Sequence, residues 1–268
     1  MKISIITPTH NEEENIGKCL QSLVKQSFKP QQIIVVDDGS TDKTLKVVSD
    51  YADERFQIVT RPRHKKGDIH RVPYVLREGS RLLDDNFDFV AILDADTVLE
   101  KDYYLKLTKA LKVQANMGIA GGKLCNQPDT GLILGLLPYV YGCNRVYTRE
   151  CWMKLNEGKV MKPVPSWDTY HNVYARMLGF NPKRVESAVS WSLRPTRTTP
   201  PFLKGYVSYQ LGYPMWYLFG RAARNLSPAM SAGYLKALVS GEKQYPTKQF
   251  VRQMQVERVT NVFGRLLF

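Results

Sequence analysis

The chain has 268 residues, of which 43% are hydrophobic, and its 38 lysines and arginines against 25 aspartates and glutamates give a formal net charge of +13. This length and apolar content support one large α/β domain, or a catalytic domain with a modest appendage, and they exclude global disorder. The positive charge favours polyanionic partners such as nucleic acid, phosphorylated small molecules or an anionic membrane, although a solvated basic surface has the same composition.

Cysteine usage and the N-terminus bear on the compartment. Cys19, Cys125, Cys143 and Cys151 form no CxxC pair and show no metal-ligand spacing, which is typical of a reducing compartment. The N-terminus turns polar after six residues, and no apolar run has the length of a transmembrane helix. We therefore expect a cytoplasmic protein, either soluble or peripheral on the cytoplasmic membrane face.

Strands and helices are predicted to alternate through the first part of the chain. Apolar runs at 2–6, 32–38, 56–59 and 88–94 favour strands, and Asn11 is expected to cap the helix that follows the first of them. Continuous apolar strands separated by helices are typical of a parallel sheet covered on both faces. Ligands of such sheets bind at the carboxyl ends of the strands.

The pattern loosens after residue 115. "GIAGG" (118–122) predicts a strand, and "GLILGLLPYVYG" (131–142) predicts an apolar loop or helix. A helix is expected to start near Asp168, and strands with a loop are expected over 182–196. The chain from Pro200 onward reads as mainly helical, with Pro228 among its boundaries.

Carboxylates gather at the predicted strand ends. Asp94 and Asp96 flank Ala95 directly after an apolar strand, and their hard oxygens suit Mg²⁺ or Mn²⁺, which also bridge diphosphate oxygens. Two solvated aspartates at a strand end would give the same pattern. Asp37 can accept hydrogen bonds from a base or a ribose, although Asp38 and the glycine and serine after it are also ordinary turn chemistry.

Three motifs in order carry a family resemblance. "PTHNEEENI" (8–16), "VVDDGSTD" (35–42) and "LDADT" (93–97) resemble the nucleotide-binding half of family 2 glycosyltransferases, which have the GT-A fold. The resemblance implies a mostly parallel α/β sheet flanked by helices. It also implies a catalytic domain at 1–198, with a nucleotide-binding half at 1–115 and an acceptor half at 116–198, followed by a helical C-terminal extension at 199–268.

The same resemblance implies a donor site for a nucleoside-diphosphate sugar of the UDP or GDP type. Its members would be Thr7, Pro8, His10, Glu12, Asp37, Asp38, Arg71, Asp94, Ala95 and Arg194. Mg²⁺ or Mn²⁺ would bind Asp96 and Asp94. Asp96 is expected to be the firmer ligand, since Asp94 also suits the ribose or a metal-bound water.

The second half resembles the family in two further segments. In "SWDTYHNVYARMLGF" (166–180), Asp168 matches the general base, and Trp167 stands on the acceptor side where an acid is usual. In "SLRPT" (192–196), Arg194 matches the arginine of a loop that closes over the diphosphate, while Ser192 replaces a histidine. The resemblance implies inverting transfer to an acceptor hydroxyl or lipid phosphate, on a glycan or a lipid-linked acceptor.

Other functions remain alternatives. A sugar nucleotidyltransferase needs a glycine-rich basic loop after the first strand, which "TPTHNEE" lacks, and a dehydrogenase needs a G-x-G-x-x-G that is absent. A nucleic-acid-binding protein would interleave aromatic and basic residues, whereas the aromatics here cluster in the C-terminal third, so nucleic acid is not expected as a partner. A sugar-binding homologue without catalysis stays open.

Aromatic residues recur every three or four positions in "YVSYQLGYPMWYLFGRAARN" (206–225), with Arg221 and Arg224 behind them. Such a stripe suits the interface of an anionic membrane, and a helix docked on the catalytic domain has the same pattern. Residues 248–267 are a second basic amphipathic candidate. The basic run at 61–66 is expected to be mostly solvated.

Overall fold

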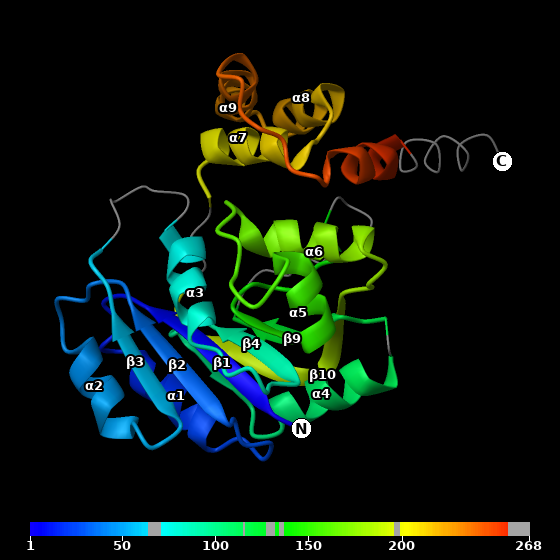
Figure 1. Cartoon of the computed structure of the whole chain (residues 1–268). Helices are drawn as coiled ribbons and strands as arrows, with labels where there is room; N and C mark the ends of the chain where they lie inside the picture. The colour runs from blue at the N-terminus through cyan, green and yellow to red at the C-terminus, as the bar shows by residue number, and fades with distance from the viewer. Residues whose placement is uncertain (64–70, 115, 127–131, 134–136, 196–198, 257–268) are drawn as a thin grey trace. The chain divides into compact units, whose positions relative to one another are not determined.

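The computed structural model describes residues 1–63, 71–114, 116–126, 132–133, 137–195 and 199–256 (Figure 1). The chain divides into two compact units. Unit 1 holds residues 1–131 and 138–196, and unit 2 holds residues 132–137 and 197–268. The predicted helix candidate at 248–267 and the basic run at 61–66 lie partly outside the described residues.

Unit 1 is built on an eight-stranded sheet with the order β3-β2-β1-β4-β9-β6-β10-β5. Its strands are β1 (Ile3–Thr9), β2 (Gln32–Asp37), β3 (Phe56–Thr60), β4 (Phe89–Leu93), β5 (Thr97–Leu99), β6 (Ile119–Cys125), β9 (Asn144–Thr148) and β10 (Lys183–Ser192). Strands β3, β2, β1 and β4 are parallel, β9 runs antiparallel to both its neighbours, and β5 is antiparallel to β10. The predicted mostly parallel sheet is confirmed, with antiparallel pairing in its second half.

A second, two-stranded sheet pairs β7 (Leu132–Ile133) with β8 (Leu137–Pro138). These strands fall in "GLILGLLPYVYG", for which we expected a loop or helix; residues 139–142 are the expected loop, and at the two short strands the prediction is wrong. Short apolar runs do not distinguish helix from strand by periodicity alone, and the glycines of this segment favour turns.

Six helices of the described chain cover the two faces of the large sheet (Figure 1). They are α1 (Ile16–Val24), α2 (Thr44–Tyr51), α3 (Arg71–Arg81), α4 (Tyr103–Val113), α5 (Arg149–Asn156) and α6 (Trp167–Met177). One apolar core joins the sheet to α1, α2 and α4, and another joins it to α3, α5 and α6. The strands β2 and β4 are buried along their whole length, which explains their continuous apolar sequences.

The loop between β1 and α1 differs from the prediction. Helix α1 begins at Ile16 behind Asn15, and Asn11 has a left-handed backbone with φ 51°. The Asn11 side chain instead accepts a hydrogen bond from the Thr41 backbone N–H at 2.8 Å, and its own N–H donates to the Ser40 hydroxyl at 2.9 Å. Asn11 therefore ties two strand-end loops together and leaves Glu12 outside the helix.

Helix α3 lies unusually close to the sheet. A Cβ atom added at Gly79 would be only 2.6 Å from Cγ2 of Ile6 on β1 and 3.0 Å from Cγ2 of Val36 on β2. Any larger residue at this position would push α3 outward. The glycine thus fixes the helix that begins with Arg71 against the strands whose ends carry the candidate site.

Unit 2 contains α7 (Pro201–Leu211), α8 (Met215–Arg224) and α9 (Pro228–Val239), which confirms the predicted helical C-terminal region and the boundary at Pro228. Helices α7 and α9 touch through glycines, since a Cβ at Gly205 would be 1.8 Å from the Met230 carbonyl oxygen. Gly212, with φ 89°, ends α7. In the described part of the chain, no helix is long and apolar enough to cross a membrane.

The predicted aromatic stripe is divided by this break between helices. Tyr209 on α7 packs edge-on against Tyr234 of α9, with ring centroids 5.3 Å apart, and Tyr213 stacks on Tyr217 at the same separation. Trp216 is 52% exposed. Most of the stripe therefore packs within unit 2, and only part of it faces solvent.

Candidate active site

Asp94 and Asp96 lie in the turn between β4 and β5, and both are partly exposed. The backbone N–H of Asp94 donates to the Cys143 carbonyl at 3.0 Å, and the backbone oxygen of Asp96 accepts from the Leu193 N–H at 2.8 Å. These bonds fasten the turn to the segment before β9 and to the segment after β10. The two carboxylates are consequently held on a fixed backbone rather than on a free loop.

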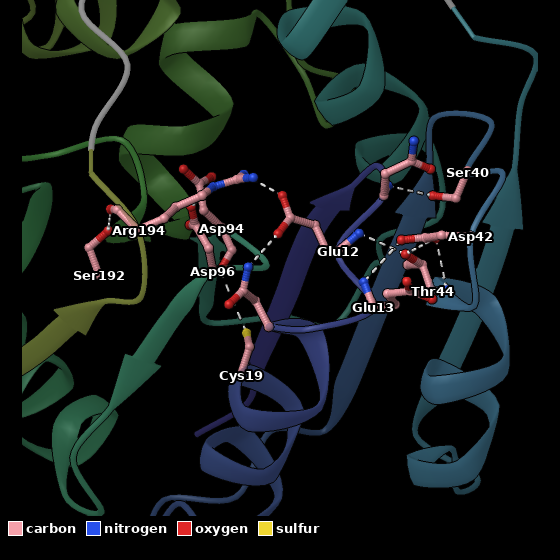
Figure 2. A network of polar contacts seen from close by, with 12 residues as sticks. Glu12, Glu13, Cys19, Ser40, Asp42, Thr44, Asp94, Asp96, Ser192 and Arg194 are labelled. Atoms are coloured by element: carbon pink, nitrogen blue, oxygen red, sulfur yellow. Dashed lines mark hydrogen bonds and ion pairs between the residues drawn. The ribbon is translucent and has the colours of Figure 1, made fainter.

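Arg194 joins two of the carboxylates predicted for the donor site (Figure 2). Its Nε donates to Oδ2 of Asp96 at 2.6 Å, and its Nη2 is ion-paired with Oε1 of Glu12. Glu12 is 5% exposed, and its other oxygen accepts from the Asn15 side chain at 3.1 Å. Three residues predicted from separate motifs are therefore brought together, and the guanidinium balances two acids.

The electrostatics of Asp94 reflect this crowding of negative charge. Burial, together with the carboxylates of Asp96, Asp168 and Glu12, raises the pKa of Asp94 to about 7, although the charge of Arg194 acts in the opposite direction. A divalent cation would favour the ionised form of Asp94, and carboxylate oxygens are the ligands that Mg²⁺ and Mn²⁺ take. The residues present thus fit such an ion, which would draw its remaining ligands from elsewhere.

Two cysteine thiols lie beside the carboxylates. Burial raises the pKa of Cys19 and of Cys143 well above the usual value, and the charges of Asp94 and Asp96 add to the effect on both. The Cys19 thiol donates to the Asp94 backbone oxygen at 3.6 Å. Both thiols stay neutral at physiological pH. Among the described residues, no three His, Cys, Asp or Glu side chains form a metal-binding group by themselves.

Asp168 lies in the first turn of α6 and is close enough to Asp94 for its charge to affect the Asp94 pKa. Its Oδ2 accepts a hydrogen bond from the Tyr139 hydroxyl, and its Oδ1 accepts from the Thr169 N–H at 2.8 Å. The residue that caps α6 is Ser166, which has a left-handed backbone with φ 48°. Asp168 is therefore not the helix cap, and its carboxylate has a defined orientation.

A fully buried arginine supports the start of α6. Arg145 on β9 donates to two backbone oxygens, that of Tyr141 at 2.8 Å and that of Asp168 at 3.2 Å. Its guanidinium lies 5.0 Å from the ring centroid of Trp167. Asn172 donates to the same Asp168 oxygen at 2.8 Å. Trp167, which was predicted for the acceptor side, is buried and packs against this arginine.

Tyr139, Arg145 and Asn172 were not identified from the sequence. Tyr139 lies in the segment read only as an apolar loop or helix, where nothing local marks its hydroxyl. Arg145 had a usable signal, because a lone charge inside the strand "NRVYT" must find partners when the strand is buried. Asn172 had none, since an amide on a helix is ordinary.

Asp37 and Asp38 at the end of β2 are both buried and serve different contacts. Asp37 accepts from the Ser40 N–H at 3.1 Å and from the Ser40 hydroxyl, which is turn chemistry. Asp38 lies between two arginines, with Nε of Arg71 at 3.6 Å and Nε of Arg61 at 3.8 Å. The basic run at 61–66 was expected to be mostly solvated; Arg61 is half-buried beside Asp38, Arg63 is exposed, and the rest of the run lies outside the described residues.

The remaining predicted donor residues line the same strand ends. Thr7 is fully buried on β1, Pro8 pairs with Val36 of β2, and His10 is half-buried after the strand. Ala95 is 4% exposed and packs into the core below α1. Within the described chain the Thr7 hydroxyl and Nδ1 of His10 have no hydrogen-bond partner. Arg71 pairs with Asp38, and no described contact brings it to Asp96.

Comparison with known proteins finds a family match over the first half of the chain. Residues 4–134 match the family described as "Glycosyl transferase family 2". An N-acetylglucosaminyltransferase of Azorhizobium caulinodans is 27% identical over 164 residues, covering 59% of this chain and 37% of that protein. A Methanococcus voltae dolichyl N-acetyl-α-D-glucosaminyl phosphate 3-β-D-2,3-diacetamido-2,3-dideoxy-β-D-glucuronosyltransferase is 35% identical over 107 residues, covering 38% and 31%. The chain thus spans less than two fifths of either relative.

Solved structures share the fold. The mannosyltransferase PcManGT from Pyrobaculum calidifontis, in complex with GDP-Man and Mn²⁺, superposes with a TM-score of 0.61 at 19% identity, covering 98% of this chain and 87% of that one. Glucosyl-3-phosphoglycerate synthase from Mycobacterium tuberculosis, with Mn²⁺, UDP and phosphoglyceric acid, gives 0.56 at 19% identity, covering 78% and 75%. At these identities the likeness confirms the predicted GT-A fold.

Proposed function

Because the chain belongs to glycosyl transferase family 2, we propose that it is an inverting glycosyltransferase that uses a nucleoside-diphosphate sugar. The acceptor would be a hydroxyl of a glycan or of a lipid-linked sugar, or a lipid phosphate. The observation that carries the proposal is the convergence of Asp94, Asp96, Asp168 and Arg194 from three separate segments onto one place. This is the charge arrangement that departure of a diphosphate and deprotonation of a hydroxyl both require.

On the donor side, Asp96 and Asp94 would hold Mg²⁺ or Mn²⁺, which when bound neutralises charge on the leaving diphosphate. Arg194 would add a second positive group to the same leaving group. The proposal requires Arg194 to exchange at least one of its carboxylate partners, Asp96 or Glu12, for diphosphate oxygens. Thr7, Pro8, His10 and Asp37 would surround the base and the ribose, where the Thr7 hydroxyl and the His10 ring offer unused polar atoms.

On the acceptor side, Asp168 would take the proton of the acceptor hydroxyl as its oxygen attacks the anomeric carbon. The bond from that carbon to the diphosphate oxygen breaks in the same step, and the nucleoside diphosphate leaves with the electron pair. Attack opposite the leaving group inverts the anomeric centre. A positioned base contributes about 10²–10⁴ in rate.

A donor screen tests the proposal. Thermal shift with UDP and GDP, with and without Mn²⁺, is expected to show stabilisation by one nucleotide that depends on the metal. The matching nucleotide sugars are then assayed for slow hydrolysis and for transfer. If neither nucleotide stabilises the protein with Mn²⁺ present, the proposed donor class is wrong.

We also propose that unit 2 binds the surface of an anionic membrane. Helix α8 exposes Met215, Trp216 and Phe219 beside the basic Arg221 and Arg224, and its Leu218 faces inward. An outward apolar face with cations at its end suits the headgroup region. Flotation with vesicles containing anionic lipid is expected to carry the protein upward at low salt, and Trp216→Ala is expected to reduce this. Failure to float at low salt would contradict the proposal.

A further inference from the structure

A groove runs along unit 1 between helix α1 and the end strand of the large sheet. It has a volume of about 910 Å³, and α1 lines one side of it while β5 and the end of β10 line the other. We call it the lysine groove, because Lys18, Lys25, Lys29 and Lys101 all line it. None of the residues described above as donor or acceptor groups lines the groove. The proposed reaction centre therefore gives the groove no role.

The charge of the lysine groove has one sign. No aspartate or glutamate is among the residues that line it. Other lysines of unit 1 have acidic partners, for example Lys106 with Glu100 and Lys154 with Glu150, each at 2.7 Å. Within the described chain, Lys18, Lys25 and Lys101 have no such partner. The groove therefore presents positive charge that is available to an anionic ligand.

The lining between these lysines is apolar and includes an indole ring. Trp191 on β10 is 36% exposed, and Val98, Leu99 and Leu193 continue the lining beside it. An exposed tryptophan offers a flat apolar face on which the C–H face of a sugar ring can pack. A sugar chain that carries acidic groups would use both the indole and the lysines. Bases of a single-stranded nucleic acid can also stack on an indole, and it is the position of the groove beside the candidate active site that favours a sugar chain.

The lysine groove adjoins the candidate active site. Leu193, which lines the groove, donates its N–H to the Asp96 backbone oxygen at 2.8 Å. On the opposite side, Lys18 immediately precedes Cys19, whose thiol donates to the Asp94 backbone oxygen at 3.6 Å. A ligand chain that lies in the groove would thus have one end near Asp94 and Asp96, the carboxylates that we assign to donor binding.

We propose that the lysine groove binds an acidic oligosaccharide, with sugar rings on Trp191 and carboxylate or phosphate groups on the lysines, as an extended part of the acceptor. This proposal rests on the proposed glycosyl transfer for its role. The binding itself needs neither donor nor metal and can be measured without them.

The test is calorimetric binding of two acidic probes to the full chain, hexagalacturonic acid and a phosphorylated mannopentaose, with maltohexaose as the neutral control. At least one acidic probe is expected to bind and maltohexaose is not. Lys18→Glu with Lys25→Glu should weaken binding by at least about tenfold, and Trp191→Ala by a similar factor. The matched control is Lys46→Glu with Lys112→Glu, which reverses two exposed charges outside the groove and should change affinity less than about threefold.

Several results would overturn the proposal. These are no binding of either acidic probe, equal loss in the control variant, no effect of Trp191→Ala, or equally tight binding of an oligothymidylate of the same charge. Binding of anionic vesicles that depends on Lys18 and Lys25, without oligosaccharide binding, would also overturn it and assign the lysines to a membrane. Nucleotide binding with Mn²⁺ is measured on the same samples. An absence of oligosaccharide binding in the groove is thereby distinguished from an absence of the proposed nucleotide binding.

Discussion

The proposed donor side and the proposed acceptor side of the candidate site are held by different means. Asp94 and Asp96 directly follow β4, and Glu12 follows β1, so the parallel strands themselves bring these carboxylates to one edge of the sheet. Asp168 is on a helix, and its orientation depends on Tyr139 and Arg145, which come from other segments. The donor side is built by local sequence at strand ends, whereas the acceptor side is built by tertiary contacts.

This difference predicts different responses to mutation. A change on the donor side should act on the affinity for nucleotide and leave the fold of unit 1 intact, because the strands are held by their own cores. A change on the acceptor side should act on turnover, and where it removes a buried contact it should also act on stability.

The largest expected effect is that of Asp168→Asn. The amide keeps the shape and one of the two acceptor oxygens, but it cannot take a proton, so transfer should fall by about 10²–10⁴ while nucleotide affinity is unchanged. Steady-state transfer and nucleotide titration measure the two quantities. Glu150→Gln, in the first turn of α5, is the matched control and should leave transfer unaltered. Full transfer by Asp168→Asn would refute the base assignment.

Arg194→Gln tests the donor side. Loss of a charged group that contacts the diphosphate should weaken nucleoside-diphosphate binding about 10–100-fold, since hydrogen bonds to charged groups contribute about 1.5–3 kcal/mol. Titration in the presence of Mn²⁺ measures the affinity. Arg81→Gln removes an exposed arginine paired with Glu78 and serves as the control. An unchanged affinity in Arg194→Gln would mean that this arginine only balances Asp96 and Glu12.

The buried His171 makes the stability of unit 1 depend on pH. Burial and the charge of Arg145 lower its pKa from 6.5 to about 3, so the unfolded chain binds a proton that the folded chain does not. This contribution is present above pH 6.5 and is lost as pH falls towards 3, by up to about 1.4 kcal/mol per pH unit. Urea unfolding between pH 7 and 4 measures it. His171→Phe should flatten the slope, and an equal slope in that variant would contradict the assignment.

Tyr139→Phe is expected to have the smallest effect. It removes one hydrogen bond to the Asp168 carboxylate, and such a bond contributes about 0.5–1.5 kcal/mol, so kcat should fall roughly 2–12-fold with KM for the donor unchanged. Tyr217→Phe on α8 is the control. If the affinity for the donor changed instead, Tyr139 would act on donor binding and not on Asp168, which would contradict the prediction.

The same contrast explains what the sequence could predict. The strand ends near Glu12, Asp94 and Asp96 could be predicted from the sequence, because an apolar run followed by acidic residues indicates both a strand and the position where it ends. The ion pairs of Arg61 and Arg71 with Asp38, and the hydrogen bond from Tyr139 to Asp168, join residues far apart in the chain, and no local pattern encodes them. Asn11 looked like a helix cap, yet its side chain found the Thr41 N–H of the next loop, a tertiary contact that overrode the local preference.

The separation of the two sides is tested most directly by one calorimetric titration with the nucleotide that the screen identifies, in the presence of Mn²⁺. It is carried out on the unaltered chain, on Asp96→Ala and on Asp168→Asn. We expect the unaltered chain and Asp168→Asn to bind with the same affinity, and Asp96→Ala to lose the metal-dependent binding. Unchanged binding by Asp96→Ala, or loss of binding in Asp168→Asn, would contradict the account.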